Sequence, residues 1–215
     1  MTPAEQSQHT LAICQMAPVI PVLVIETVDH AEPLAKALVA GGLPVLEVTL
    51  RTESALDAIR IMAQVEGAVV GAGTVLTPEQ MQAAAEAGAR FAVAPGATTS
   101  LVDAARLNDM PLLPGAQTCS EVMSLLERGY TVQKFFPAEA IGGVTALKSI
   151  SGPLPQVRFC PTGGISAARA PEYLALPNVV CVGGSWVTPK ANMDAGDWAT
   201  ITKLAHAAVQ LPHTG

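Results

Sequence analysis

The chain has 215 residues, of which 50% are hydrophobic and 14% are charged, and its formal net charge is −6. This composition excludes a disordered chain, which would carry few apolar residues and many charges. No block of Lys or Arg is present, which argues against a nucleic-acid-binding surface. No segment resembles a membrane span or a secretory leader, so we expect a cytoplasmic protein with no membrane partner.

The first residues carry a helix signal. Thr2-Pro3-Ala4-Glu5 combines a capping hydroxyl, a proline at the first helical position and a carboxylate three residues after the cap. We predict a helix from Thr2 to about Gln15, within an N-terminal segment 1–16. This helix lies outside the main repeat and is expected to cover the bottom of the fold.

From residue 18 to residue 210, short runs rich in Val and Ile alternate with longer stretches of helical spacing. The expected strands are Val19–Ile25, Val45–Thr49, Ala68–Gly71, Phe91–Ala94, Pro111–Leu113, Thr131–Phe135, Val157–Cys160 and Val179–Val182. The expected helices centre on Ala31–Ala40, Ser54–Gln64, Pro78–Ala87, Leu101–Leu107, Ser120–Arg128, Val144–Ser149, Ala167–Leu174 and Trp198–Val209.

This alternation gives eight strand–helix units. Strands that are apolar throughout are typical of a parallel sheet covered on both faces. No linker or break in composition divides the chain, so we predict an α/β fold in which residues 1–215 form one domain. The predicted architecture is a single (β/α)8 TIM barrel with an extra N-terminal helix. An open doubly wound sheet would show the same alternation, but it usually has fewer units.

Polar residues gather at the ends of the predicted strands, where the active sites of such barrels lie. Glu47, Thr49 and Arg51 share one face of the second strand because side chains alternate along a strand. A glutamate within an apolar strand is costly unless it is paired or functional. A structural pair of Glu47 with Arg51 is the alternative, although residues four apart on a strand are separated by roughly 13 Å at the backbone.

Lys134 lies in the sixth strand, within Thr131-Val132-Gln133-Lys134-Phe135-Phe136-Pro137. Its apolar neighbours predict a poorly hydrated amine. Desolvation favours the neutral form of a lysine, and the neutral form is the nucleophile. The alternative is a lysine that extends from the strand end into solvent.

Two glycine pairs, Gly163-Gly164 and Gly183-Gly184, each follow a strand and precede helix-like sequence. Glycine allows positive φ angles and lets an anion approach the backbone closely. Phosphate sites after the seventh and eighth strands recur in these barrels. With Ser185 as a hydroxyl donor, the pairs predict a phosphate site, and ordinary turn glycines are the alternative.

No metal site is expected. His9, His30, His206 and His213 do not lie at the strand ends. The cysteines have no C-x-x-C or histidine-rich spacing, so we expect buried thiols rather than zinc ligands or disulfides; they are Cys14, Cys119, Cys160 and Cys181.

With these residues in view, the chain resembles the 2-keto-3-deoxy-6-phosphogluconate (KDPG) aldolase family, which includes 4-hydroxy-2-oxoglutarate (KHG) aldolase activity. The similarity extends from about Pro18 to the last helix. The segments that carry it are Gly42–Leu50 followed by Arg51, Val70–Leu76, Lys134–Glu139 and Val157–Gly164. The resemblance implies a cofactor-free and metal-free class I aldolase of the Entner–Doudoroff pathway that acts as a homotrimer.

The resemblance also implies a role for each site residue. Lys134 would form a Schiff base with the substrate and Glu47 would be the general acid and base. The implied substrate-binding residues are Arg51 and Thr74 at the pyruvyl carboxylate, Pro95 and Phe136 in the pocket wall, Thr162 at the sugar-acid chain, and Gly163, Gly164, Gly184 and Ser185 at the phosphate. Some relatives carry an arginine in the first strand, where this chain reads Pro21-Val22-Leu23-Val24-Ile25, so Arg51 would act alone.

The expected reaction is cleavage of 2-dehydro-3-deoxy-6-phosphogluconate to pyruvate and glyceraldehyde 3-phosphate. Cleavage of KHG to pyruvate and glyoxylate is a second expected activity. A phosphosugar epimerase or synthase on the same barrel is one alternative, and an aldolase for the C4 epimer of the galactonate series is another. A non-catalytic phosphometabolite-binding protein would leave Glu47 and Lys134 without a purpose.

Overall fold

The computed structural model describes residues 1–212, so His213 lies outside the described residues. The strands in this part of the chain are β1 (Val19–Leu23), β2 (Val45–Thr49), β3 (Val69–Gly73), β4 (Phe91–Val93), β5 (Leu112–Leu113), β6 (Gly115–Ala116), β7 (Val132–Phe135), β8 (Arg158–Pro161) and β9 (Val182–Gly184). The α-helices are α1 (Pro3–Cys14), α2 (Ala31–Ala40), α3 (Ala55–Met62), α4 (Pro78–Glu86), α5 (Thr99–Leu107), α6 (Cys119–Glu127), α7 (Gly143–Ser151), α8 (Ala170–Leu174), α9 (Lys190–Asp194) and α10 (Trp198–Val209). Short 3-10 helices cover Val28–His30 and Glu139–Ile141.

The predicted N-terminal helix is confirmed as α1. Thr2 is its N-cap, and Glu5 completes a capping box, because the Glu5 N–H donates to the Thr2 hydroxyl while the Thr2 N–H donates to the Glu5 carboxylate. The Gln6 side chain accepts from the N–H of Leu112, and the Ser7 hydroxyl accepts from the N–H of Thr131. Since these N–H groups lie at the starts of β5 and β7, α1 covers the N-terminal ends of the strands.

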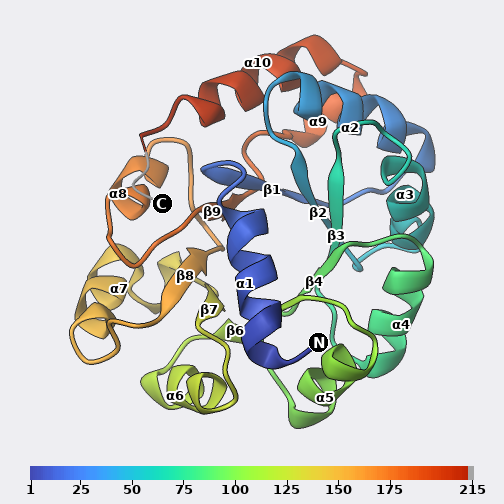
Figure 1. Cartoon of the computed structure of the whole chain (residues 1–215). Helices are drawn as coiled ribbons and strands as arrows, with labels where there is room; N and C mark the ends of the chain where they lie inside the picture. Colours follow the sequence, from blue (N-terminus) through green and yellow to red (C-terminus); the bar gives the residue numbers. More distant parts are fainter. Residues whose placement is uncertain (213–215) are drawn as a thin grey trace.

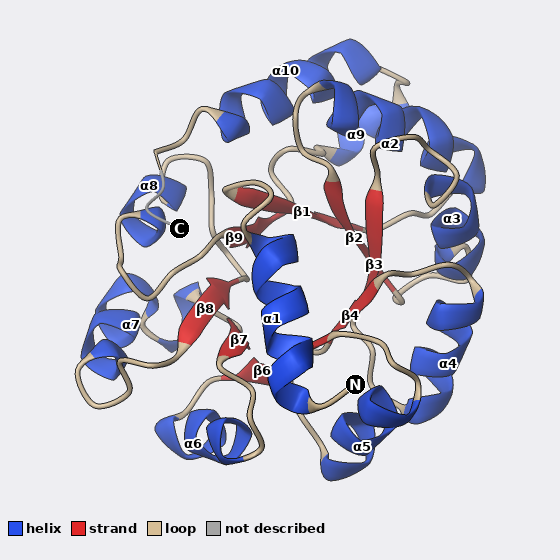
Figure 2. Cartoon of the chain, in the orientation of Figure 1, coloured by secondary structure: helices blue, strands red, loops and turns tan. Residues whose placement is uncertain are grey.

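The strands form a curled parallel sheet with α1 across one end and the other helices around its outside (Figures 1 and 2). Six strands follow the order β5-β4-β3-β2-β1-β9, and three follow the order β6-β7-β8. The expected fifth strand, Pro111–Leu113, corresponds to β5, and the structure adds a separate short strand, β6, directly after Pro114. Proline has no N–H to donate to a ladder, which accounts for the break between the two strands. Isolated parallel bridges Phe159–Val179 and Thr162–Gly183 connect β8 with the β9 segment.

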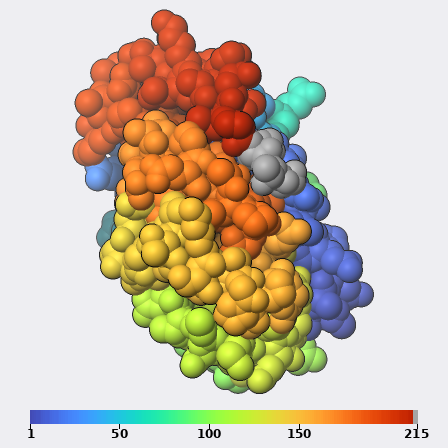
Figure 3. All heavy atoms as spheres, turned by 90° about the vertical axis from the view of Figure 1, so that its left-hand side faces the viewer, coloured from blue at the N-terminus to red at the C-terminus, as the bar shows by residue number. Residues whose placement is uncertain are grey.

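Hydrophobic side chains pack in two layers. The inner cluster includes Ile20, Val45, Phe91 and Val132, which come from alternate positions of the strands, together with Cys14 of α1. The outer cluster joins the opposite strand faces to the helices. Burial on both faces explains why the strands are almost uniformly apolar in sequence. On the outer face of the molecule shown in Figure 3, the regions of α7, α8 and α10 follow one another in chain order.

Some boundaries differ from those expected. β3 extends to Gly73 rather than Gly71, and β9 is Val182–Gly184, so it begins at the residue where the expected strand Val179–Val182 ends. The short helix α9 was not expected. Cys119 is exposed rather than buried, because it begins α6, whereas the other three thiols are buried. Within residues 1–212, no helix is long and apolar enough to cross a membrane.

Candidate active site

Lys134 and Glu47 meet inside the curl of the sheet. Lys134 lies on β7 and Glu47 on β2, and the Lys134 Nζ donates a hydrogen bond to Glu47 Oε1 at 3.2 Å. Their exposed fractions are 4% and 3%. A buried amine and carboxylate at this distance form an ion pair that can also pass a proton between its partners. The pair gives the site one candidate nucleophile and one candidate base.

Apolar groups surround the lysine. Its Nζ lies 5.3 Å from the centre of the Phe136 ring, a distance at which the ring face attracts a cation. Gly115 and Cys160 are the register partners of Lys134 on the neighbouring strands. Water therefore has little access to the amine, as the sequence of this strand indicated.

Gly73 at the end of β3 determines where the Glu47 carboxylate can lie. A Cβ atom at position 73 would be 2.7 Å from Glu47 Cγ and 2.9 Å from Cδ, and closer still to Oε1. Gly73 is not among the expected site residues. The available signal was a glycine within a strand, which often marks a close approach of another group.

Arg51 and Thr74 form a second contact pair, beyond the ends of β2 and β3. The Arg51 Nε donates to Thr74 Oγ1 at 3.2 Å. Thr74 has a φ of 57°, in the left-handed region that a β-branched residue rarely adopts. Such strain is found at functional sites. Thr49 lies on the same face of β2 as Glu47 but is not part of this contact pair, because its hydroxyl donates to the carbonyl of Leu23 at 2.8 Å.

Thr162, Gly163 and Gly164 form a turn directly after β8. Gly163 and Gly164 have φ angles of 106° and 78°, which favour glycine. The turn is tied to the segment after β7, because Ala138 N–H donates to the Thr162 carbonyl at 2.8 Å and Glu139 N–H donates to the Gly163 carbonyl at 3.1 Å. Thr162 is 6% exposed, and its side chain occupies the space that a Cβ of Gly183 would need.

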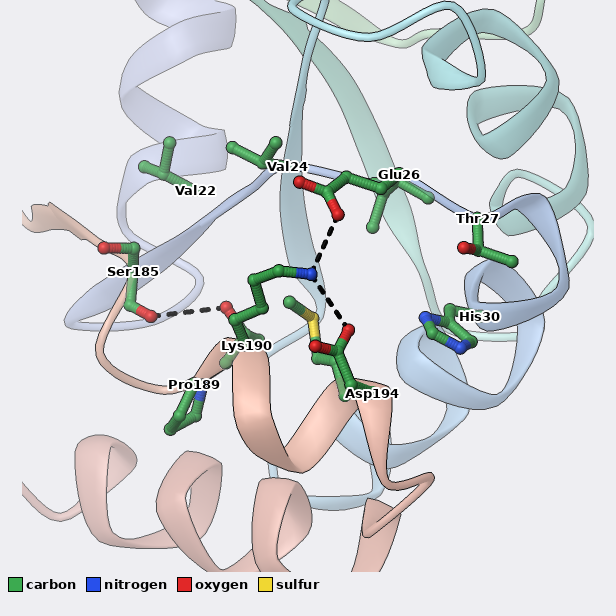
Figure 4. A pocket seen from close by; sticks show the side chains of 12 residues that line it. Val22, Val24, Glu26, Thr27, His30, Ser185, Pro189, Lys190 and Asp194 are labelled. Carbon is green, nitrogen blue, oxygen red and sulfur yellow. Dashed lines mark hydrogen bonds and ion pairs between the residues drawn. The ribbon is translucent and has the colours of Figure 1, made fainter.

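Ser185 lines a cleft of about 380 Å³ between the segments that follow β1 and β9 (Figure 4). Val22 lines the same cleft and is the register partner of Glu47, so the inner end of the cleft is level with the buried pair. At its outer side, the Lys190 amine lies between Glu26, at 2.8 Å, and Asp194, at 3.1 Å. Hydrogen bonds to these two carboxylates raise the pKa of Lys190. Gly184 has no room for a Cβ because Trp186 packs against it.

Pro95 and Phe136 line a different opening, of about 280 Å³, together with Gly115. The predicted site residues therefore fall into groups around the curl: the buried pair with Phe136, the Arg51–Thr74 contact, the turn at Thr162, and Ser185 in its cleft. Glu47 and Lys134 lie within β2 and β7, and the other site residues end or follow strands at the C-terminal end of the sheet, opposite to the end that α1 covers.

Three of the four thiols, Cys14, Cys160 and Cys181, are buried. Cys14 and Cys181 belong to the inner hydrophobic cluster with Cys160. Contact with Cys160 raises the pKa of Cys14, contact with Cys14 raises that of Cys181, and burial adds to both. These two thiols therefore remain protonated near neutral pH. The Cys160 sulfur lies 4.0 Å from Thr162 Oγ1.

Comparison with known proteins places this geometry in a family. The family model "KDPG and KHG aldolase" matches residues 11–204. The KHG/KDPG aldolase of Escherichia coli K12 is 56% identical over 200 residues, covering 93% of this chain and 94% of that protein. The crystal structure of the KDPG aldolase of Zymomonas mobilis ZM4 with 3-phosphoglycerate has a TM-score of 0.93 at 51% identity, covering 97% of this chain and 98% of that one.

A third relative was solved with a bound intermediate. The KDPG aldolase of Legionella pneumophila, with pyruvate captured at low pH as a covalent carbinolamine intermediate, has a TM-score of 0.90 at 49% identity and covers 93% of this chain and 98% of that one. The match extends over nearly the whole length of both chains in each comparison. This chain belongs to the KDPG and KHG aldolase family.

Proposed function

We propose that this chain is a class I aldolase that cleaves 2-dehydro-3-deoxy-6-phosphogluconate to pyruvate and glyceraldehyde 3-phosphate. The observation that carries the proposal is the buried hydrogen bond of 3.2 Å between Lys134 and Glu47. An aldolase of this class needs a nucleophilic amine next to a base, in a place with little water. The covalent pyruvate carbinolamine of the Legionella relative supports the same chemistry.

The reaction begins at Lys134. Transfer of the ammonium proton to Glu47 frees the amine, which adds to the C2 ketone of the substrate to give a carbinolamine. Glu47 returns its proton to the carbinolamine hydroxyl, which leaves as water, and the protonated imine that forms withdraws electrons from the C3–C4 bond. The Phe136 ring, 5.3 Å from Nζ, would stabilise the positive charge of this imine.

Bond cleavage requires a base. Glu47 removes the proton of the C4 hydroxyl, the C3–C4 bond breaks, and glyceraldehyde 3-phosphate leaves. Glu47, through a water molecule, returns a proton to the enamine carbon, and hydrolysis of the imine releases pyruvate and regenerates the lysine. The iminium does the work that a metal ion does in class II aldolases, so no cofactor is part of the proposal.

The two ends of the substrate need separate sites. Arg51, positioned by its contact with Thr74, would bind the pyruvyl carboxylate. Thr162 would contact the sugar-acid chain, and Pro95 with Phe136 would shape the wall. The phosphate would be held by Gly163, Gly164, Gly184 and Ser185. Gly163 and Gly164 have positive φ angles, and turns of this kind can direct backbone N–H groups toward an anion.

Borohydride reduction tests the proposal. With pyruvate present, we expect reduction to add a three-carbon acid to one peptide, the one that contains Lys134, and to abolish activity. Lys134→Ala should show neither activity nor adduct, whereas Lys148→Ala, which changes an exposed lysine of α7, should behave like the wild type. Full activity in Lys134→Ala, or an adduct elsewhere, would overturn the proposal.

KHG is a second substrate that the comparisons support, because the Escherichia coli relative is named for both compounds. KHG keeps the pyruvyl end and lacks the phosphate, so it would use Lys134, Glu47 and Arg51 alone. A comparison of kcat/KM for KDPG, its C4 epimer and KHG measures the preference among them. An epimerase or synthase without an imine would be insensitive to borohydride.

We also propose the finer architecture and assembly. Closure of the two strand ladders into one (β/α)8 barrel over residues 18–210, within a single domain of residues 1–215, is supported by the bridges between β8 and the β9 segment. A homotrimer should have, in sedimentation equilibrium, three times the 22.1 kDa mass of one chain. Four free thiols are consistent with a reducing cytoplasm.

A further inference from the structure

Glu139 is part of the Lys134–Glu139 segment that marks the family, yet the proposed reaction gives it no role. It lies in the 3-10 helix after β7 and faces the turn after β8. Its N–H donates to the Gly163 carbonyl at 3.1 Å. Its side chain packs directly behind the next residue of that turn, because a Cβ at Gly164 would lie 2.9 Å from Glu139 Cβ and 3.1 Å from Cγ.

Two side chains hold the Glu139 carboxylate in place. The fully buried Tyr173 of α8 donates its hydroxyl to Glu139 Oε1. Burial, followed by this hydrogen bond, raises the pKa of Tyr173, so the hydroxyl remains a donor at any physiological pH. The Arg169 guanidinium lies 3.7 Å from the same oxygen, and its positive charge offsets the carboxylate. A third neighbour, Gly143, has a φ of 53° and leaves room for the Tyr173 hydroxyl, which a Cβ there would approach to 2.7 Å.

We propose that Glu139 is a positioning residue for phosphate binding: its side chain, held by Tyr173 and Arg169, supports the Gly163–Gly164 turn in the conformation that receives the substrate phosphate. The proposal rests on the function proposed above. Gly163 and Gly164 are free to adopt many conformations in isolation. The backbone bond to Gly163 and the packing behind Gly164 restrict that freedom before the ligand arrives, and a pre-organised site binds more tightly.

The charge of the pair has a further consequence. A carboxylate beside a phosphate site would repel the ligand if it stood alone. Arg169 lies between two carboxylates, Glu139 at 3.7 Å and Glu172 at 2.9 Å, and its bonds to both oxygens of Glu172 keep the guanidinium in this position. The guanidinium therefore offsets part of the negative charge that Glu139 places beside the anion site.

The test separates the two ends of the substrate. Glu139→Ala should raise KM for KDPG, and Ki for inorganic phosphate as an inhibitor of KHG cleavage, by about tenfold. KM and kcat for KHG, which has no phosphate, should stay within about twofold. Glu139→Gln keeps the packing and an acceptor for Tyr173, and is the matched control that should remain close to the wild type.

A purely structural role would change both substrates together. If Glu139→Ala does not fold, Tyr173→Phe removes only the hydroxyl that holds the carboxylate, and it should raise Ki for phosphate by about threefold at unchanged KHG kinetics. An unchanged ratio of KM values between KDPG and KHG in the folded variants would overturn the positioning role. A wild-type protein that cleaves neither compound would instead overturn the proposed function.

Discussion

Gly73→Ala is expected to displace the Glu47 carboxylate without changing any reacting group. The backbone of Gly73 is not in the left-handed region, so alanine is compatible with the local conformation. The new Cβ, however, would lie 2.7 Å from Glu47 Cγ and 2.9 Å from Cδ, where ordinary contacts begin at 3.4 Å. Relief of this overlap requires the carboxylate to move by about 1 Å, and a displacement of that size can cost about 100-fold in rate.

The expected result is a fall in kcat of about 100-fold for both KDPG and KHG, since Glu47 is the base for both substrates in the proposed mechanism. Overpacking of a buried site costs about 1–3 kcal/mol, so the thermal midpoint should fall by several degrees while the fold is retained. Steady-state kinetics, together with far-UV circular dichroism and thermal unfolding, measure the two effects separately.

Gly152→Ala is the matched control, because nothing lies within 4 Å of a Cβ at that position. It should have wild-type kinetics. A wild-type kcat in a folded Gly73→Ala protein would refute the reasoning, because it would mean that the position of Glu47 does not limit the reaction. A loss of the same size in Gly152→Ala would refute it as well.

Three further predictions concern the surroundings of the site. Thr74→Gly should stabilise the fold by about 1 kcal/mol, because it relieves a positive φ, but should raise KM for both substrates because Arg51 loses its acceptor. Hydrogen bonds from Thr200 and then Asn192 lower the pKa of Asp197, the N-cap of α10. A carboxyl group with a lowered pKa stabilises the fold above the ordinary aspartate range, and this stabilisation is lost as the pH falls through the pKa of the folded state. The higher Tm of the wild type relative to Asp197→Asn should therefore disappear on acidification. Lys190→Met leaves Glu26 and Asp194 unpaired beside the Ser185 cleft, and should raise KM for KDPG alone by about threefold at low salt.

For each of these three predictions, one result would contradict the reasoning. A lower Tm in Thr74→Gly would mean that the threonine conformation is not strained. A Tm difference between wild type and Asp197→Asn that persists down to pH 3 would contradict the assigned stabilisation. An equal effect of Lys190→Met on KHG, or one that is independent of ionic strength, would exclude an electrostatic influence on the phosphate end.

The sequence was sufficient for the alternation of strands and helices. Apolar runs at regular intervals predict parallel strands, and the shared strand face of Glu47 and Thr49 follows from the alternation of side chains. The capping box at Thr2 likewise depends only on neighbouring residues. These features are local, so pattern alone specifies them.

Features that depend on distant parts of the chain were not accessible. The sequence placed Pro114 directly after the expected fifth strand, Pro111–Leu113, but could not indicate that a further short strand, β6, follows it, because β6 forms by pairing with β7. The roles of Gly73 and Glu139 depend on atoms from other units, namely the side chain of Glu47 and the turn at Gly164. A glycine in a strand and a glutamate after one have many explanations until their neighbours are known.

The division of strands into two ladders has a consequence for how activity reports on folding. Glu47 belongs to the six-stranded ladder and Lys134 to the three-stranded one, so each ladder holds one half of the proposed catalytic pair. Neither segment of a chain cut at Pro114 would contain both groups, yet two such fragments that reassociate correctly would restore them. The recovered aldolase activity would then measure the fraction of fragment pairs that have associated correctly, without any spectroscopic signal.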